Sequence, residues 1–433
     1  MKRVAIIGAG AAGCFCAAQL RSMVPDAEVT VFEAGVKPMA KLAITGGGRC
    51  NLTNDFQGIR SLAEAYPRGE RVMKRALKAF SNEDTIHWFT ERGVPCILQE
   101  DHCWFPVSQD AMDVVRCLER NMKGADIRLK TPVHSIEYHA FNGPAAEENY
   151  FSQGFAKNQF SPANAMPTRC HSERSEESFQ VNGESFDYVV VTTGGPAKGL
   201  PFLDGLGLEI VPPVPSLFTF KIPDPSLTSL MGLVVEAQIA LQGTPYKAQG
   251  PLLITDWGLS GPATLKLSSY AARHLAETGY KGTVSVNWLD ANENDVRERL
   301  LETSVKNPQK QVSNTPLLQQ RLWEHLLQKA GLRPDLRWAE LGSKGMNRLT
   351  AVLTNDTYPL SGKSKFREEF VTAGGVALSN VDLNTLECKR QPGLYFAGEV
   401  LDIDAITGGF NLQAAWSTAY ICARSIAAIT TVK

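Results

Sequence analysis

The sequence predicts an α/β fold in which both ends of the chain build one Rossmann-type domain. Residues 3–33 read as strand, turn, helix and strand, which is the opening unit of such a domain. An apolar strand and a long helix return at residues 393–428, and the stretch between is first β-rich and then helical. We therefore expect a split domain that carries an inserted β-rich domain and a small helical subdomain.

Composition limits the classes of partner. With 433 residues, the chain is long enough for two or three domains. Its 44 basic and 45 acidic residues give a net charge of −1, so no general basic excess is available to neutralise phosphates, and we expect no nucleic-acid partner. Nine cysteines without a Cys-x-x-Cys pair argue against a zinc ribbon and fit a reducing cytoplasm. No apolar run reaches membrane-spanning length, so we expect no membrane partner. The histidines at 87, 102, 134 and 139 show no metal-ligand spacing, so we expect no bound metal.

The first strand, at residues 3–7, runs into the sequence Gly-Ala-Gly-Ala-Ala-Gly, which opens a helix over residues 11–23. In this fingerprint Gly8 permits a tight turn, Gly10 lets the backbone approach a pyrophosphate, and Gly13 allows close packing of helix and strand. The N–H groups and dipole at the helix start favour phosphate. We include the intervening Ala9 and Ala12 among the cofactor contacts. A signal peptide is the alternative for this basic and apolar stretch, but the fixed glycine spacing and the following strand favour the nucleotide site.

Glu33 ends the second strand, residues 28–33, twenty positions after the last glycine of the fingerprint. A carboxylate there accepts hydrogen bonds from a ribose diol and repels a 2′-phosphate, so FAD or NAD is favoured over NADP at this site. FAD is favoured over NAD because the strand at 393–399 ends in Gly398 and Glu399 and a helix follows it. FAD-binding domains of the glutathione-reductase type return to the nucleotide domain in this way at the C-terminus, whereas two-domain NAD dehydrogenases do not. The stretch at 189–195 adds a middle strand that ends in Gly194 and Gly195 near the cofactor.

The segments that follow have weaker signals. Residues 35–58 read as an extended loop, and residues 61–123 as mostly helical. Ser81 with Asp84 forms a capping box, and Ser108 is placed to cap the next helix. The remaining predicted segments are strands at 127–138, a poorly ordered excursion at 140–178, a hairpin turn at Asn182-Gly183, a strand at 188–191, a helix near 263–276, helices within 292–340, and strands within 370–400.

These segments divide the chain into predicted domains. The FAD-binding domain comprises residues 1–195, with the excursion at 140–178, and residues 365–433; the β-rich domain comprises 196–290 and 341–364; the helical subdomain comprises 291–340.

The run Thr-Gly-Gly-Gly-Arg-Cys-Asn at residues 45–51 is the most unusual stretch. Three successive glycines give a backbone that can wrap an anion or a flat ring. Arg49 can pair with a pyrophosphate, and Cys50 and Asn51 add a thiol and an amide. A flexible surface loop is the alternative, and the sequence alone leaves both open.

Together with the fingerprint, four runs resemble the BaiN-like flavoprotein family, whose members are described as NAD(P)/FAD-dependent or aminoacetone-oxidase-like oxidoreductases. The runs are TGGGRCNLTN, FPVSQDAMDVV, GLSGPATLKLS, and VTAGGVAL followed by GLYFAGEVLDIDAITGGFNLQAAW. The resemblance covers nearly the whole chain and implies the split FAD domain with its two insertions. It also implies the following cofactor contacts: Gly48, Arg49, Cys50, Asn51, Gly398, Glu399, Asp402, Gly409, Phe410, Asn411 and Leu412. We add Lys41, Val133 and Gly408 to the predicted contacts.

The chain departs from the family pattern at two places. The glycine-rich stretch that many relatives carry after the middle strand is shorter here, at residues 195–207, and a basic residue is replaced by Cys103-Trp104. We expect an FAD-dependent oxidoreductase that acts on a small organic molecule with NAD(P)H as donor. A flavin oxidase of a small amine and a non-redox flavin binder are the alternatives. No acid or base is identified; Cys50 is a candidate reactive thiol, with a packing role as its alternative. The sequence does not reveal the oligomeric state.

Overall fold

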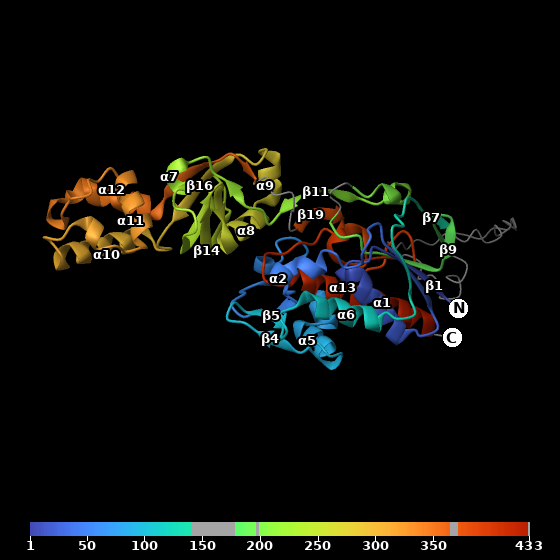
Figure 1. The fold of residues 1–433 in the computed structure, drawn as a ribbon. Coiled ribbons are helices and arrows are strands. Elements are labelled where there is room, and N and C mark those ends of the chain that lie inside the picture. The colour runs from blue at the N-terminus through green and yellow to red at the C-terminus, as the bar shows by residue number, and fades with distance from the viewer. Residues whose placement is uncertain (140–177, 196–198, 364–370, 432–433) are drawn as a thin grey trace, which may run out of the picture.

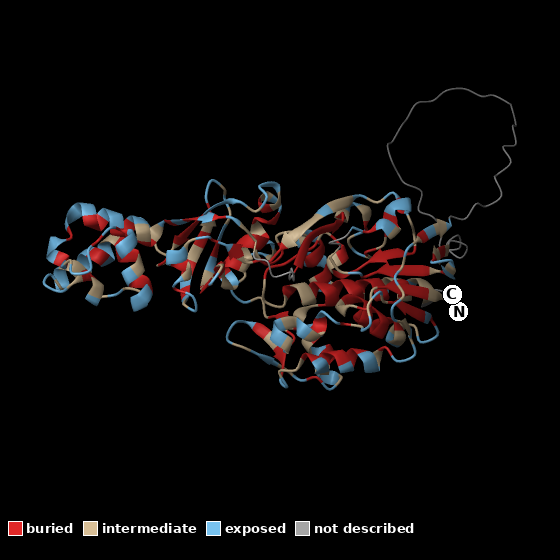
Figure 2. Cartoon of the chain, turned by 45° about the horizontal axis from the view of Figure 1, so that its top comes forward, coloured by how far each residue is buried: buried red, intermediate tan, exposed pale blue. Residues whose placement is uncertain are grey.

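A computed structural model of the chain describes residues 1–139, 178–195, 199–363 and 371–431. The molecule is elongated, with the nucleotide domain at one end, a β-rich domain in the middle and a helical unit at the other end (Figure 1). The two termini lie next to each other on the nucleotide domain in both views (Figures 1 and 2). The predicted excursion falls almost wholly outside the described residues.

The nucleotide domain is organised around a five-stranded parallel sheet in the order β20-β10-β1-β2-β6. Apolar residues dominate four of these strands because both faces are covered, as is usual for parallel sheets. The C-terminal strand pairs with a strand from the middle of the chain, so the predicted split of this domain is confirmed. The strands are β1 (Arg3–Ile7), β2 (Glu28–Phe32), β6 (Asp126–Arg128), β10 (Tyr188–Val191) and β20 (Leu394–Phe396).

Helices α1 (Ala11–Met23) and α13 (Phe410–Thr431) pack side by side although they come from opposite ends of the chain. Their contact includes an aromatic pair, since the Phe15 ring lies 5.3 Å from the Trp416 ring; Phe15 also lies 4.8 Å from the Trp88 ring of helix α5 (Asn82–Glu91). Figure 2 shows buried residues concentrated in this sheet and its helices. The other helices here are α2 (Thr45–Gly48), α3 (Leu62–Ala65), α4 (Glu70–Ala79), α5 (Asn82–Glu91) and α6 (Ala111–Asn121).

Between residues 53 and 122, the structure differs from the sequence prediction in one sheet and one helix cap and agrees with it in another cap. A small antiparallel sheet, β3 (Thr53–Asn54), β5 (Cys103–Pro106) and β4 (Cys96–Leu98), interrupts the stretch predicted as mostly helical. The capping box at Ser81 and Asp84 is confirmed. Asp110, and not Ser108, caps α6, because its side chain accepts the N–H of Met112 at 2.9 Å.

A second antiparallel sheet joins β7 (Ile136–His139), β8 (Ser178–Val181) and β9 (Glu184–Phe186). Asn182 and Gly183 form the predicted two-residue turn between its last two strands, both with positive φ (50° and 82°), as a type I′ turn requires.

A two-stranded ribbon, β11 (Ile210–Ser216) with β19 (Val371–Val376), carries the chain to and from the middle domain. That domain contains a seven-stranded sheet and helices α7 (Pro225–Thr228), α8 (Gly261–Tyr270) and α9 (Ala272–Glu277). The strands, in sheet order, are β17 (Asp356–Leu360), β16 (Gly282–Asn287), β13 (Val234–Leu241), β14 (Lys247–Thr255), β15 (Gly258–Ser260), β12 (Phe220–Lys221) and β18 (Gly362–Lys363).

The helical unit contains α10 (Glu293–Lys306), α11 (Gln320–Lys329) and α12 (Gly342–Thr354). Helix α12 packs against α10 and α11, so this unit extends past the boundary at residue 340 that the sequence predicts. The buried residues of the β-rich domain and the helical unit form one continuous apolar cluster, separate from that of the nucleotide domain. The two insertions therefore share a core.

Candidate functional site

The predicted pyrophosphate loop lies between β1 and α1. Gly8 has φ +105°, and a Cβ there would lie 2.7 Å from the carbonyl oxygen of Thr192. A Cβ on Gly13 would lie 1.9 Å from the oxygen of Gly8. Gly10 differs, because no heavy atom of the described residues lies within 4 Å of the Cβ position. No side chain caps the first turn of α1. The loop thus has packing reasons for two glycines and an open cradle, with free N–H groups, at the third.

Glu33 lies directly beyond β2, beside this loop. Its Oε2 accepts the N–H of Ala9 at 2.9 Å, and its Oε1 accepts the N–H of Gly35 at 2.6 Å. The N–H of Thr131 donates to the backbone oxygen of Glu33 at 2.8 Å, which brings the segment containing half-buried Val133 to the same edge. Three predicted contacts, Ala9, Glu33 and Val133, therefore lie together where an adenosine would bind.

Glu399 lies between the ends of strand β10 and the β11–β19 ribbon. Its Oε1 accepts the N–H of Thr372 at 2.8 Å. A Cβ on Gly195 would lie 2.7 Å from the same Oε1, and one on Gly194 would lie 3.6 Å from Oε2. The sequence predicted these three residues for one site, and the structure brings them together.

Gly398 and Ala12 connect this carboxylate to the pyrophosphate loop. Gly398 has φ +76°, and a Cβ on it would lie 3.0 Å from the Cβ of Ala12. Its N–H donates to Oγ1 of Thr418 in α13 at 2.9 Å. The contact explains why a small residue stands at each position.

The glycine loop at residues 45–51 has three successive positive φ angles: 58° at Gly46, 69° at Gly47 and 84° at Gly48. The Cβ positions of Gly47 and Gly48 have no described atom within 4 Å. Arg49 is exposed, and its guanidinium carbon lies 4.4 Å from the centre of the Phe105 ring. The loop thus presents bare backbone and one cation.

Cys50 follows this loop with φ +61° and is fully buried. Burial raises the pKa of the Cys50 thiol to about 12, so the thiol stays protonated at physiological pH. These facts argue against the reactive thiol considered from the sequence and favour its packing alternative. Lys41 is exposed beside the same loop.

The start of α13 is fitted tightly against the strand that follows this loop. Gly409 has φ +87°, and a Cβ on it would lie 2.6 Å from the oxygen of Thr53. Asn51 satisfies both neighbours when its amide nitrogen donates to Thr53 O (3.0 Å) and its amide oxygen accepts the N–H of Gly409 (3.2 Å). A Cβ on Gly408 would lie 2.9 Å from the Phe410 ring. The chain's own packing therefore requires both glycines.

The Asn411 side chain makes hydrogen bonds to the backbone of the protein itself. Its Oδ1 accepts the N–H of Ala405, and its Nδ2 donates to Ala405 O, both at 3.0 Å. Asp402, also predicted to face the cofactor, pairs with Arg273 of α9 at 2.8 Å. Leu412 is partly buried against the apolar core. The first two side chains hold the loop at 402–409 and the domain junction in place.

Sequence reasoning did not identify Arg68 and Asp404. Arg68 makes a bidentate ion pair with Asp404, which is fully buried, and the Arg68 side chain is only 12% exposed. Ser216 Oγ donates to Asp404 at 2.9 Å, and Arg68 Nη1 donates to the oxygen of Ser269 in α8 at 2.8 Å. The cluster ties the loop before α13, the ribbon and the β-rich domain together.

Gln413 was also not identified. It is fully buried near the start of α13, where its Oε1 accepts hydrogen bonds from Thr53 (2.6 Å) and Thr85 (2.9 Å), and its Nε2 donates to Ser417 (2.8 Å). A glutamine on the apolar side of a predicted helix was the available signal, because a buried amide needs such partners.

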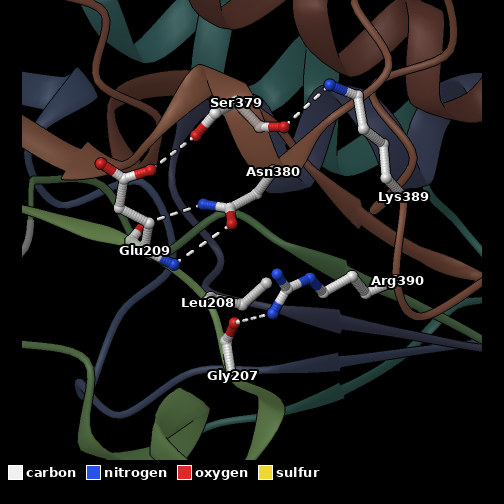
Figure 3. Close-up of a pocket in the computed structure, with 7 residues that line it drawn as sticks. All are labelled: Gly207, Leu208, Glu209, Ser379, Asn380, Lys389 and Arg390. Carbon is white, nitrogen blue, oxygen red and sulfur yellow. Dashed lines mark hydrogen bonds between the residues drawn. The ribbon is translucent and has the colours of Figure 1, made fainter.

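Two cavities lie outside this cleft. The larger, of 490 Å³, is bordered by polar groups that satisfy one another: Ser379 donates to Glu209, and Arg390 donates to Gly207 O (Figure 3). The smaller, of 290 Å³, lies where α1, α5 and α6 end. Its arginines donate to backbone oxygens there, as Arg21 does to Pro25 at 2.9 Å. Both arrangements stabilise the fold without a ligand.

No helix in the described part of the chain is both long and apolar enough to cross a membrane. Family models match two stretches: the HI0933-like protein Rossmann domain matches residues 2–148, and the HI0933-like protein barrel and H2TH domain matches residues 214–371. The chain belongs to the HI0933-like family. The predicted family resemblance is confirmed, and this member of the HI0933-like family is an FAD-dependent oxidoreductase.

Three full-length relatives of this HI0933-like chain have curated names. A "Ribosomal RNA dihydrouridine synthase" of Haemophilus influenzae is 31% identical and covers 97% of each chain. A protein of the same name from Escherichia coli is 30% identical and covers 98% of this chain and 97% of its own. A "3-dehydro-bile acid delta(4,6)-reductase" of Clostridium scindens is 27% identical and covers 99% of both.

The residues present fit FAD. The cradle at Gly10, with the uncapped N-terminus of α1, would hold the pyrophosphate. Glu33 would accept from the adenosine ribose, and Glu399 would face the ribityl chain. The flavin, when bound, supplies the transfer of a hydride or of single electrons. The protein's part is to bind it, orient it and exclude water.

Proposed function

We propose that this protein uses FAD to reduce a carbon–carbon double bond conjugated to a carbonyl group, with NAD(P)H as electron donor, and that the bond is C5=C6 of uridine in ribosomal RNA. The observation that carries this proposal is the end-to-end similarity to two ribosomal RNA dihydrouridine synthases, at 31% and 30% identity. Dihydrouridine is uridine saturated at this bond, next to the C4 carbonyl.

The third relative supports the reaction class from a different substrate. Its name describes reduction of double bonds in a 3-dehydro bile acid, in which a ketone is conjugated with the alkene. In both substrates the carbonyl withdraws electrons, so the far carbon of the alkene accepts a hydride and the near carbon accepts a proton. Such a reduction needs a bound flavin and an electrophilic alkene, but no reactive thiol, which agrees with the burial of Cys50.

The earlier expectation of a small organic substrate and no nucleic acid stays untested, and the RNA hypothesis replaces it here. The donor is also a proposal. No second Gly-x-Gly-x-x-Gly occurs in the sequence, so NAD(P)H would bind without that fingerprint.

The test uses the FAD-loaded protein under argon with NADPH or NADH and an unmodified ribosomal RNA transcript. Nucleosides are then analysed by mass spectrometry, and a uridine heavier by two hydrogens is the expected product. A reaction without nicotinamide is the control.

Three other outcomes would each replace the proposal. A flavin bleached by NAD(P)H and reoxidised by a 4-en-3-one steroid, but not by RNA, indicates a small-enone reductase. Peroxide formed from small amines in air indicates an oxidase. A flavin that no donor bleaches indicates a non-redox binder.

A further inference from the structure

One helix of the nucleotide domain carries an unusual row of cations. Helix α4 has arginine at 71 and 75 and lysine at 74 and 78, and all four residues are exposed. At about 100° per residue, these positions fall within about 100° of arc on one face of the helix. We call Arg71, Lys74, Arg75 and Lys78 the α4 stripe. Its length along the axis is about 10 Å.

The α4 stripe is unpaired. None of its four side chains makes an ion pair or hydrogen bond to any residue that the structure describes. Some charged helix residues elsewhere do have partners, as Lys306 has in Glu302 and Arg116 has in Asp113. The only acidic residue of α4 is Glu70, at its first position.

Helix stability does not explain this arrangement. Arg71 with Arg75 and Lys74 with Lys78 are like charges four residues apart, which destabilises a helix. Arg71 also lies in the first turn, where the helix dipole disfavours cations; only Lys78, in the last turn, is favoured by the dipole. By contrast, the arginines at the 290 Å³ cavity donate to backbone oxygens at helix ends, where cations are favoured. The α4 stripe is therefore more readily explained by an external anion.

The N-terminal end of α4 lies beside the loop that leads to α13. Gly69 directly precedes the helix, and a Cβ there would lie 2.7 Å from the Ile403 side chain in that loop. Arg68, one residue earlier, forms the buried pair with Asp404. An extended ligand on the stripe can thus reach the edge of the site.

The other face of α4 indicates which anion fits. Val72, Met73 and Ala76 are fully buried, and the helix packs on α13. The apolar face is therefore committed to the core and is not available to enter a lipid surface. A stripe of about 10 Å matches about three successive phosphates of one nucleic-acid strand.

We propose that the α4 stripe is a binding site for the phosphate backbone of RNA and aligns the substrate strand with the flavin cleft. The choice of RNA rests on the proposed function. The local charge is consistent with it: without Arg68, which is paired with Asp404, residues 60–78 contain five basic and two acidic residues, in a chain whose net charge is −1.

The test compares two variants of the FAD-loaded protein that each lose four positive charges. The first is Arg71→Gln, Lys74→Gln, Arg75→Gln and Lys78→Gln, in which glutamine preserves helix propensity. The control is Lys221→Gln, Lys247→Gln, Lys281→Gln and Lys310→Gln, at exposed positions of the inserted domains. The probe is a fluorescent 40-nucleotide uridine-rich RNA, titrated between 50 and 200 mM KCl.

We expect the stripe variant to bind about 10- to 100-fold more weakly at 100 mM KCl. The slope of log Kd against log salt should fall by about 2, since each of about three phosphate contacts on a single strand contributes about 0.7. The control should change by less than about twofold, and FAD content and flavin reduction by NAD(P)H should be unchanged in both. An equal loss in the two variants would overturn the proposal.

Footprinting of the wild-type chain tests the site without any substitution. RNA should protect Lys74 and Lys78 from acetylation and leave Lys247 and Lys281 reactive; absence of protection at α4 would refute the proposal. Binding to phosphatidylglycerol vesicles in preference to RNA would also overturn it, in favour of a membrane. If the wild type binds RNA through the stripe but forms no dihydrouridine, only the proposed function fails. If the stripe variant forms dihydrouridine with an unchanged KM for RNA, only this inference fails.

Discussion

Replacing Asp404 by asparagine should destabilise the protein far more than replacing Asp402, although both carboxylates pair with an arginine at the junction of the two domains. Asp404 is fully buried, and Arg68 is 12% exposed. The side chains of the Asp402–Arg273 pair are 17% and 47% exposed. The two pairs are therefore a matched comparison of a buried and an exposed ion pair.

The magnitude follows from what each change leaves behind. In Asp404→Asn, an amide nitrogen replaces one oxygen, so donors on Arg68 and Ser216 compete for a single acceptor. The Arg68 guanidinium also stays buried without a counter-ion. Breaking a buried ion pair in this way lowers the free energy of unfolding by about 3–5 kcal/mol. In Asp402→Asn, water can solvate the exposed Arg273 guanidinium, so the free energy of unfolding should fall by only about 0.2–1 kcal/mol.

Urea unfolding followed by tryptophan fluorescence measures both effects, because Trp416 lies in the nucleotide core and Trp288 in the other core. The pair energy is isolated by a double-mutant cycle with Arg68→Met. Removal of both charges should cost less than the two single changes together, by at least about 2 kcal/mol. Equal losses for Asp404→Asn and Asp402→Asn, or an additive cycle, would refute the reasoning.

Two further predictions concern the glycine loop and the buried thiols. Gly10→Ala should fold normally and bind FAD at least about tenfold more weakly. Gly13→Ala should instead lose stability, because only a Cβ at position 13 meets protein atoms, at 1.9 Å. Urea midpoints and FAD retention on dialysis measure the difference between the two variants, and equal behaviour would contradict the prediction. Burial raises the pKa of Cys16 and of Cys50 from 9.0 to about 12. The folded state therefore retains these protons between about pH 9 and 12 while the unfolded state releases them, so stability should fall as pH rises, by up to about 1.4 kcal/mol per thiol and pH unit. A urea midpoint that is the same at pH 8 and pH 10 would count against this, and Cys16→Ala with Cys50→Ala should reduce the slope.

The parts of the fold that the sequence predicts are those with strong local signals. The strand, glycine turn and helix of residues 3–23 are specified by adjacent residues, as is the type I′ turn at Asn182. Strands β4 and β5 were missed because they contain only three and four residues. They pair with each other, and β5 also pairs with β3, about 50 positions earlier. Short strands between helical segments have no periodicity of their own.

The same distinction between local signals and long-range pairing applies to the residues of the candidate site. Backbone positions such as Gly10 and acids at strand ends such as Glu33 follow from a motif, because the motif describes a local geometry. The pair of Arg68 and Asp404 joins residues 336 positions apart. Nothing at either position specifies the partner, so only the folded chain identifies them as a unit. Asp402 and Asn411 share a motif with the cofactor residues, yet their side chains hold the loop and the domain junction.

The expectation of no nucleic-acid partner rests on a whole-chain quantity, the net charge, which does not describe how charge is distributed. A net charge of −1 argues against a nucleic-acid partner only if charge is spread evenly over the surface. Counterion release depends instead on the cations that a strand of phosphates meets at one place. The α4 stripe, whose four cations have no ion-pair partner among the described residues, would provide such a place. Acidic residues elsewhere, such as Glu293 and Asp295 at the start of α10, cancel these charges in the total without screening them locally. With a Debye length of about 8 Å at physiological salt, acids in the distant helical unit have little effect on a ligand at the stripe. If the proposed RNA substrate is correct, the distribution of charge on α4, and not the net charge of the chain, is therefore the property that the binding assay measures.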